Sequence, residues 1–224
     1  MNTIKTLVIR FSNTITKQEI PLFRGAVINS GLQDNILFHN HQGEKFRYSY
    51  PLIQYKRLRG KAAIVCVGEG TDAIGELFSN QHFEYQIGKQ TVTADIENVS
   101  AHQTTVECEE TPIYYELHSW LALNSTNYAI YSSMESLSGR VEMLENILTG
   151  NILSFLKGVG IHMDSPIKVC ISNIIRESVA KYKSVLLNSF DISFSTNLRL
   201  PYFIGLGKGA STGFGVLEIN HKNK

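Results

Sequence analysis

The chain has 224 residues, of which 43% are hydrophobic and 18% are charged, and its formal net charge is +1. This length fits one large domain or two small ones, and the composition is that of a globular protein able to bury a core. A charge so close to zero excludes binding of nucleic acid through overall basicity, so such binding would depend on local patches. Apolar runs are shorter than a membrane span of about 18 residues and no signal-peptide core is visible, so we expect a cytoplasmic location and no membrane contact.

The first half of the chain is expected to begin with a strand and a helix. Alternating apolar residues predict a strand over residues 4–11, and helical spacing after a capping Thr16 predicts a helix that ends before Gly31. A polar loop over residues 32–44 comes next. Further strands are expected over 46–50, 52–57 and 61–67, then a short helix around 74–78, and one or two strands over 90–107.

The second half has a similar order of elements. We expect a strand over 114–123, a helix over 137–156, a strand over 167–171, a short helix over 174–182, one long strand or two over 185–198, and a last strand over 214–219. Strand, helix, strands, helix and strand is the order of a ferredoxin-like unit. The prediction is therefore an α+β fold of two tandem ferredoxin-like (RRM-like) domains, residues 1–110 and 111–224.

Residues 205–215 form a glycine-rich loop just before the last predicted strand. The loop has five glycines together with Lys208, Ser211 and Thr212, and such a backbone can approach a ligand closely. A P-loop is excluded because Gly209 follows the lysine, and a dinucleotide site is unfavourable because only 14 residues follow Ala210. A phosphate cradle and a flexible turn into the last strand both remain open.

His39 and His41 are separated by one residue in the predicted loop. In an extended backbone their side chains would point the same way, about 6.6 Å apart. Such a pair could act as general base and general acid at one phosphate, because histidine titrates near neutral pH. It could also bind a metal, although further ligands at suitable spacing are not apparent, or it could be two exposed loop histidines.

The segment over residues 44–61 combines six basic residues with one acid. The basic residues are Lys45, Arg47, Lys56, Arg57, Arg59 and Lys61, and they alternate with Phe46, Tyr48, Tyr50 and Tyr55. Basic groups neutralise phosphates and aromatic faces stack on the bases of single-stranded RNA. A solvated basic face above a buried aromatic row explains the same pattern, and both interpretations stay open.

These residues resemble a known family. The glycine-rich loop at 205–215, near the end of a chain with two ferredoxin-like units, is similar to the signature loop of the CRISPR-associated endoribonucleases that process repeat RNA, the Cas six family. Phe23, Arg24, Gly25 and Ala26 in the first predicted helix, and residues 50–56, also look like that family. The similarity covers roughly residues 20–70 and 199–219.

The resemblance implies an enzyme that cleaves precursor CRISPR RNA within each repeat without metal or another cofactor. The 2′-hydroxyl would attack the adjacent phosphate and leave a 2′,3′-cyclic phosphate and a 5′-hydroxyl. His39 and His41 would then be the general base and acid, and Lys45 would stabilise the phosphorane. The alternative is a non-catalytic subunit that binds repeat RNA in a CRISPR effector complex.

RNA contacts are expected from basic residues and from the glycine-rich loop. The expected residues are Arg47, Lys56, Arg57, Arg59, Lys61, Arg199, Gly205, Gly207, Lys208, Gly209, Ser211 and Gly213. The partner that the resemblance implies is the CRISPR repeat RNA, and it leaves room for other subunits of an effector complex and for a homodimer.

Overall fold

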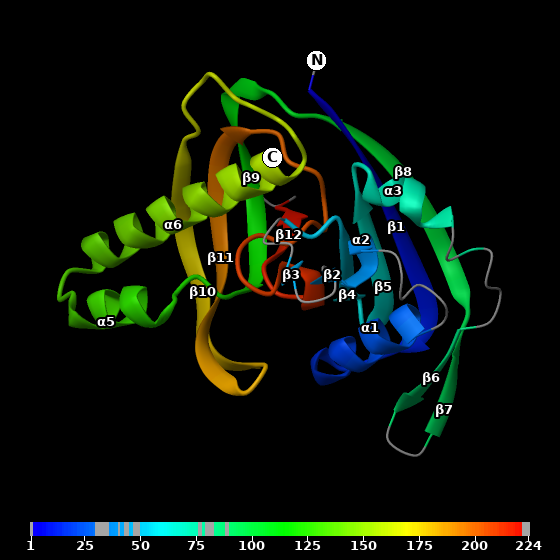
Figure 1. Cartoon of the computed structure of the whole chain (residues 1–224). Helices are drawn as coiled ribbons and strands as arrows, with labels where there is room; N and C mark the ends of the chain where they lie inside the picture. Colours follow the sequence, from blue (N-terminus) through cyan, green and yellow to red (C-terminus); the bar gives the residue numbers. More distant parts are fainter. Residues whose placement is uncertain are drawn as a thin grey trace. The chain divides into compact units, whose positions relative to one another are not determined.

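A computed structural model describes residues 2–29, 36–39, 41–42, 45–46, 50–75, 78, 83–87 and 90–220 (Figure 1). The chain divides into two compact units. The N-terminal unit is Thr3–Thr104 with Ser211–Gly213, and the C-terminal unit is Met1–Asn2, Thr105–Ala210 and Phe214–Lys224. A domain boundary after residue 110 stays a prediction. Among the described helices, none has the length and apolar character needed to cross a membrane.

The N-terminal unit is built on a four-stranded sheet. Its elements are β1 (Thr3–Thr14), η1 (Lys17–Glu19), α1 (Ile20–Asn29), α2 (Ile36–His39), β2 (His41–Gln42), β3 (Lys45–Phe46), β4 (Ile53–Leu58), β5 (Lys61–Val67), α3 (Gly70–Ala73), β6 (Phe83–Ile87), β7 (Gln90–Ala94) and β8 (Ile96–Thr105). The strand order is β4-β5-β1-β8, and β5 runs antiparallel to both β1 and β4. The first strand thus lies in the interior of the sheet, as in a ferredoxin-like unit.

Helix α1 covers this sheet with its apolar side. Ile20, Phe23 and Val27 are buried at helical spacing, and the rings of Phe23 and Phe11 of β1 meet edge to face with centroids 5.3 Å apart. The start of the helical segment is fixed by Thr16, whose backbone N–H donates to a carboxylate oxygen of Glu19 at 2.6 Å. This bond lowers the pKa of Glu19. The predicted cap at Thr16 is confirmed.

The C-terminal unit has the second four-stranded sheet. Its elements are β9 (Cys108–Trp120), α5 (Ser125–Ser133), α6 (Leu137–Gly158), β10 (Val169–Tyr182), β11 (Val185–Leu198), η2 (Ala210–Thr212) and β12 (Val216–Ile219). The strand order is β10-β11-β9-β12, so again the first strand lies in the interior. The prediction of an α+β fold with two tandem ferredoxin-like domains is confirmed.

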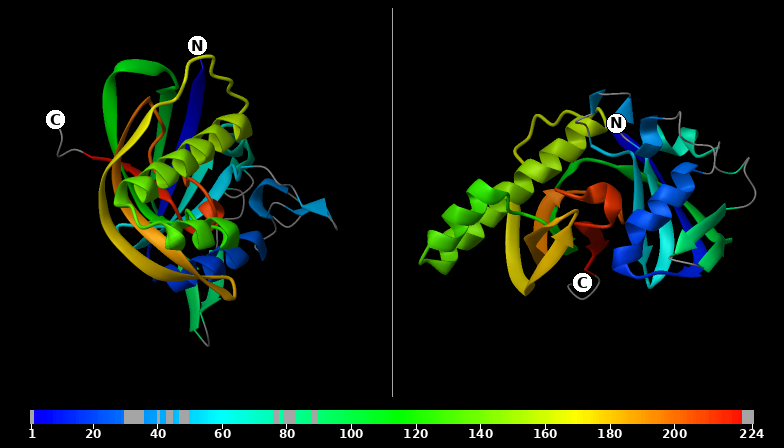
Figure 2. Two further views of the ribbon diagram at one scale, coloured as in Figure 1. Left: turned by 90° about the vertical axis from the view of Figure 1, so that its left-hand side faces the viewer. Right: turned by 60° about the horizontal axis from the view of Figure 1, so that its bottom comes forward.

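Helix α6 lies across β10 and β11 (Figures 1 and 2). Leu144, Leu148, Ile152, Phe155 and Leu156 form its buried side. The core beneath includes Phe190 and Trp120, whose ring centroids are 6.2 Å apart. Trp120 is fully buried and belongs to this core.

One predicted helix is wrong. Residues 174–182 continue strand β10, which pairs with β11 from Val169↔Thr196 to Tyr182↔Val185. The pairing shifts register between Ile171 and Asn173 and again between Ile174 and Arg176. Two irregularities so close together break the alternation that marks a strand, which is why the sequence pattern was misleading.

Other elements differ from the prediction in smaller ways. Helix α5 was not expected, whereas residues 185–198 form the single long strand β11 and residues 90–105 form β7 and β8. The expected loop over residues 32–44 contains helix α2 and strand β2. Of the strand expected over 46–50, residues 47–49 lie outside the described part of the chain.

Candidate functional site

Helix α2, which ends at His39, is held to the core of the N-terminal unit through Phe38. The Phe38 side chain is buried, and its carbonyl oxygen accepts a hydrogen bond of 3.3 Å from the hydroxyl of Tyr55 in β4. Tyr55 is fully buried against Phe23, and burial raises the pKa of its hydroxyl, so this group stays protonated and can donate. The residue before His39 is therefore fixed by a core tyrosine.

His39 and His41 belong to different secondary-structure elements. His39 is the last residue of α2, and His41 opens β2, where it pairs with Phe46 of β3. The assumption of one extended backbone through both histidines is thus wrong, and the 6.6 Å spacing does not apply. Lys45 lies opposite Gln42 in the same hairpin. The side chains of His39, His41 and Lys45, and all of Arg47, lie outside the described residues.

The tight turn between β4 and β5 gathers three of the predicted RNA-binding residues. Arg59 and Gly60 have φ of 50° and 88°, the left-handed pair that a two-residue hairpin turn requires. Arg57 and Arg59 are exposed, and Arg57 donates Nε–H to the carbonyl of Ile15 at 2.6 Å. This turn offers two guanidinium groups to solvent.

Lys61, on the other side of that turn, is already paired. Its ammonium group lies 2.5 Å from one carboxylate oxygen of Glu97, and the other oxygen accepts a hydrogen bond of 3.2 Å from Nε of Arg10. The hydrogen bond from Lys61 is the main cause that lowers the pKa of Glu97, followed by the charges of Lys61 and Arg10. Lys61 therefore contributes less free charge than Arg57 or Arg59.

The expected exposed basic face is wrong at Lys56. Its side chain is fully buried, and this burial lowers the pKa of its ammonium group to about 7. A contact between Lys56 and RNA would first require the group to become exposed. The neighbouring Tyr55 is a core residue, so at these two positions the aromatic and the basic side chain both point into the protein.

The glycine-rich loop is closed by its own backbone. Leu206 donates its N–H to Gly215 at 2.8 Å, and Phe214 donates to Gly209 at 3.3 Å. Gly215 has φ of 59°, and a Cβ there would lie 2.0 Å from the carbonyl oxygen of Leu206. The loop is thus a compact turn into β12, and glycine is needed where it folds back on itself. Gly205 is buried, whereas Gly207, Gly209, Ser211 and Gly213 are partly exposed.

Lys208 projects from this loop and is exposed. Its ammonium group lies 5.6 Å from the ring centroid of Tyr182, at the end of β10, and the ammonium group of Lys183 lies 5.9 Å from the same centroid. Phe214 packs edge to face on that ring at 5.7 Å. Tyr182 is not among the predicted contacts because residues 174–182 were expected to form a helix. The available signal was an aromatic residue next to Lys183, just before the strand predicted over 185–198.

Arg199, the remaining predicted contact, forms an ion pair. Its Nε donates to the carboxylate of Glu109 at 2.5 Å, and its side chain is 46% exposed. A phosphate would compete with this carboxylate for the guanidinium. Among the described residues, no cluster of three or more histidine, cysteine or acidic side chains could hold a metal ion.

Comparison with known proteins covers both units. The sequence profile of the Cas6b N-terminal domain matches residues 2–105, and that of the Cas6b C-terminal domain matches residues 107–219. The uncharacterized protein MJ0978 of Methanocaldococcus jannaschii is 36% identical over 102 residues, which is 46% of this chain and 68% of that protein.

Two solved structures share the fold over almost the whole length. A crystal structure of Cas6b is 27% identical, with a TM-score of 0.87 and coverage of 97% of this chain and 100% of that one. A crystal structure of the CRISPR RNA processing endoribonuclease Cas6b is 24% identical, with a TM-score of 0.72 and the same coverage. The two domain matches follow one another along the chain and together account for nearly all of it. The chain therefore belongs to the Cas6b family.

Proposed function

We propose that this protein is a metal-independent endoribonuclease that cleaves precursor CRISPR RNA within its repeats. The observation that carries the proposal is that both Cas6b domains, over residues 2–105 and 107–219, are matched in the expected order. A solved relative with the same fold is described as a CRISPR RNA processing endoribonuclease. Two histidines in the segment that follows α1 supply the acid and base that this chemistry requires.

The proposed reaction uses the RNA itself as the nucleophile. Either His39 or His41 accepts the proton of the 2′-hydroxyl while the hydroxyl oxygen forms a bond to phosphorus. The bond from phosphorus to the 5′-oxygen breaks, and the other histidine gives that oxygen a proton. The products are a 2′,3′-cyclic phosphate and a 5′-hydroxyl. Lys45 is proposed to stabilise the extra negative charge of the phosphorane.

The surfaces proposed to hold the RNA lie in both units. Arg57 and Arg59 are exposed at the β4–β5 turn, and Lys208 is exposed on the glycine-rich loop. Each can neutralise a backbone phosphate. Lys61 and Arg199 would have to share their charges with Glu97 and Glu109. Other subunits of an effector complex and a second copy of the chain stay predicted partners.

Labelled repeat RNA incubated with the protein in EDTA tests the reaction. We expect cleavage to persist in EDTA and to stop when the nucleotide before the cut carries a 2′-deoxy sugar. His39→Ala and His41→Ala should each slow cleavage at least about tenfold, since general acid–base catalysis typically contributes about 10²- to 10⁴-fold. His102→Ala, an exposed histidine of β8, is the matched control and should cleave at the normal rate.

Three outcomes would contradict the proposal in different ways. Loss of cleavage in EDTA, or cleavage of the 2′-deoxy substrate, would remove the mechanism. A normal rate in the double histidine variant would move the catalytic site elsewhere in the chain. Tight binding of the repeat RNA with no cleavage would instead indicate a non-catalytic subunit that binds the repeat.

A further inference from the structure

A β-bulge joins the sheet of the C-terminal unit to the end of the glycine-rich loop. Strands β9 and β11 pair at Trp120↔Phe190 and again at Leu117↔Ile192, so two residues of β9 face the single residue Asp191. One of the two is Ser119, whose φ is 52°, a left-handed conformation that residues other than glycine rarely adopt. Bulges of this kind re-aim the chain where a strand meets a loop.

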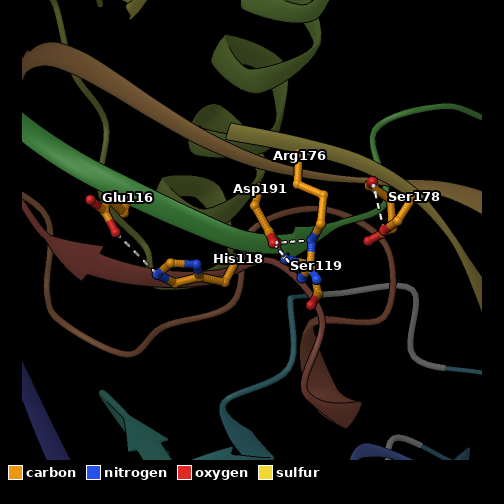
Figure 3. A network of polar contacts seen from close by, with 7 residues as sticks. Glu116, His118, Ser119, Arg176, Ser178 and Asp191 are labelled. Atoms are coloured by element: carbon orange, nitrogen blue, oxygen red, sulfur yellow. Dashed lines mark hydrogen bonds and ion pairs between the residues drawn. The ribbon is translucent and has the colours of Figure 1, made fainter. Parts of the chain in front are cut away.

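The carboxylate of Asp191 holds this bulge in place (Figure 3). One carboxylate oxygen accepts a hydrogen bond of 2.6 Å from the backbone N–H of Ser119. The carbonyl oxygen of Ser119 in turn accepts the backbone N–H of Gly215 at 3.1 Å. Gly215 is the last residue of the glycine-rich loop, so the loop is anchored to the sheet through the bulge that Asp191 supports.

The second carboxylate oxygen of Asp191 orients the guanidinium of Arg176 on β10. Arg176 lies directly opposite Asp191 in the pairing of β10 and β11, and it donates both Nε–H, at 2.9 Å, and Nη2–H, at 2.5 Å, to that oxygen. The Asp191 side chain is 12% exposed, whereas that of Arg176 is 58% exposed. The carboxylate therefore fixes one edge of the guanidinium and leaves much of the rest facing solvent.

This ion pair lies on the face of the sheet opposite the helices. Phe190 packs against Tyr131 of helix α5, with ring centroids 5.9 Å apart, and side chains alternate along a strand, so Asp191 points to the other face. That face also carries Glu116 and His118, whose side chains lie 3.6 Å apart. Glu218 of β12 lies opposite Glu116 on this face, and the Glu116 carboxylate lies beside the His118 imidazole.

We propose that Arg176 is a contact for an RNA backbone phosphate, oriented for that purpose by Asp191. A carboxylate on one edge of the guanidinium already restricts the conformations of the arginine side chain. The other edge can then bind phosphate oxygens with a smaller loss of conformational entropy. The same carboxylate anchors the loop that carries Lys208, so two cations of the C-terminal unit are positioned by one buried group. The inference rests on the proposed function, because the RNA is its ligand.

The test compares RNA affinity in a single and a double variant. The double variant Arg176→Met with Asp191→Asn removes one positive and one negative charge, so the net charge is unchanged. Asp191→Asn alone is the matched control, because its side-chain oxygen can still accept from Ser119 and Arg176 keeps its charge. Binding is measured over a range of salt concentrations with repeat RNA that carries a 2′-deoxy sugar before the cut.

We expect the double variant to bind this RNA about tenfold more weakly than the wild type, and the slope of log K against log salt to fall by about 0.7. The control should bind less tightly than the wild type but more tightly than the double variant, because Arg176 keeps its charge and loses only the carboxylate that orients it. Arg176→Lys, which keeps the charge but loses the planar fork, should bind less tightly than the wild type. It keeps a cation beside Asp191, so it decides the question if the double variant fails to fold.

Two results would overturn the inference. If the double variant and Arg176→Lys bind like the wild type, Arg176 only neutralises Asp191. If Asp191→Asn alone loses as much affinity as the double variant, the cause is the anchoring of the loop and not a contact of Arg176. Failure of the wild type to bind repeat RNA would instead refute the proposed function, so the two failures are distinguishable.

Discussion

Trp120 donates its indole N–H to the side-chain oxygen of Asn151 at 2.9 Å, and Gly207 lies against both groups. A Cβ at Gly207 would lie 2.5 Å from that oxygen and 3.0 Å from the indole nitrogen. Gly207 also has φ of 82°, which alanine rarely adopts. We expect Gly207→Ala to lower the free energy of unfolding by about 2 kcal/mol, measured by urea denaturation.

Gly150 is a matched control for this prediction because it precedes Asn151 in helix α6. A Cβ at Gly150 would meet nothing within 4 Å. Alanine is the better helix former by about 1 kcal/mol, so Gly150→Ala should stabilise the protein. If Gly207→Ala were as stable as the wild type, the loop would not lie against Trp120 and Asn151.

The hydrogen bond from Tyr55 to the carbonyl of Phe38 predicts a positioning role for a core residue. Removal of the hydroxyl in Tyr55→Phe frees the end of α2 next to His39. We expect single-turnover cleavage to slow about fivefold, which corresponds to about 1 kcal/mol, with unchanged RNA affinity. Tyr128→Phe, at an exposed tyrosine of α5, should have no effect. An unchanged rate in Tyr55→Phe would show that this bond does not position His39.

Helices and strands whose hydrophobic residues recur with a single regular period could be predicted from the sequence. Leu7, Ile9 and Phe11 alternate through β1, and the buried residues of α6 recur every three or four positions, so both elements were found. Strand β10 was partly mistaken for a helix because it is an edge strand with two register shifts. Its residues form a strand because their backbone pairs with β11, and this pairing produces no regular period in the local hydrophobicity.

The candidate site could be predicted only in part, for a related reason. The glycine-rich loop and Lys208 could be recognised from the composition of the sequence, since five glycines in eleven residues are unusual. The residues that support the loop could not be predicted. They are Tyr182, Asn151 and Asp191, which are far from the loop in the sequence and are brought close to it only by the fold. The burial of Lys56 could likewise not be predicted from the local sequence pattern, since lysine is almost never fully buried.

Lys208 is expected to act in binding and not in the chemical step. Its ammonium group is exposed and rests on the ring of Tyr182, which favours a phosphate contact. Lys208→Ala should lower the affinity for repeat RNA about fivefold and reduce the salt slope by about 0.7. Cleavage at saturating protein should stay within about twofold of the wild type, whereas the control Lys157→Ala, at an exposed residue near the end of α6, should change neither quantity. A slower cleavage step with normal affinity would place Lys208 in catalysis.

The buried ammonium group of Lys56 predicts how stability depends on pH. Burial lowers its pKa from 10.5 to about 7, so between these values the unfolded chain binds more protons than the folded one. Lys56 therefore lowers the free energy of unfolding most below pH 7, and this loss disappears as the pH rises toward 10.5. Lys56→Met removes the effect, so its gain in unfolding free energy over the wild type should be a few kcal/mol near pH 6 and shrink at higher pH. Urea denaturation of both proteins across this range measures the gain, and Lys5→Met, at an exposed lysine of β1, should show no such trend. A gain that did not change with pH would mean that Lys56 keeps its proton in the folded protein throughout.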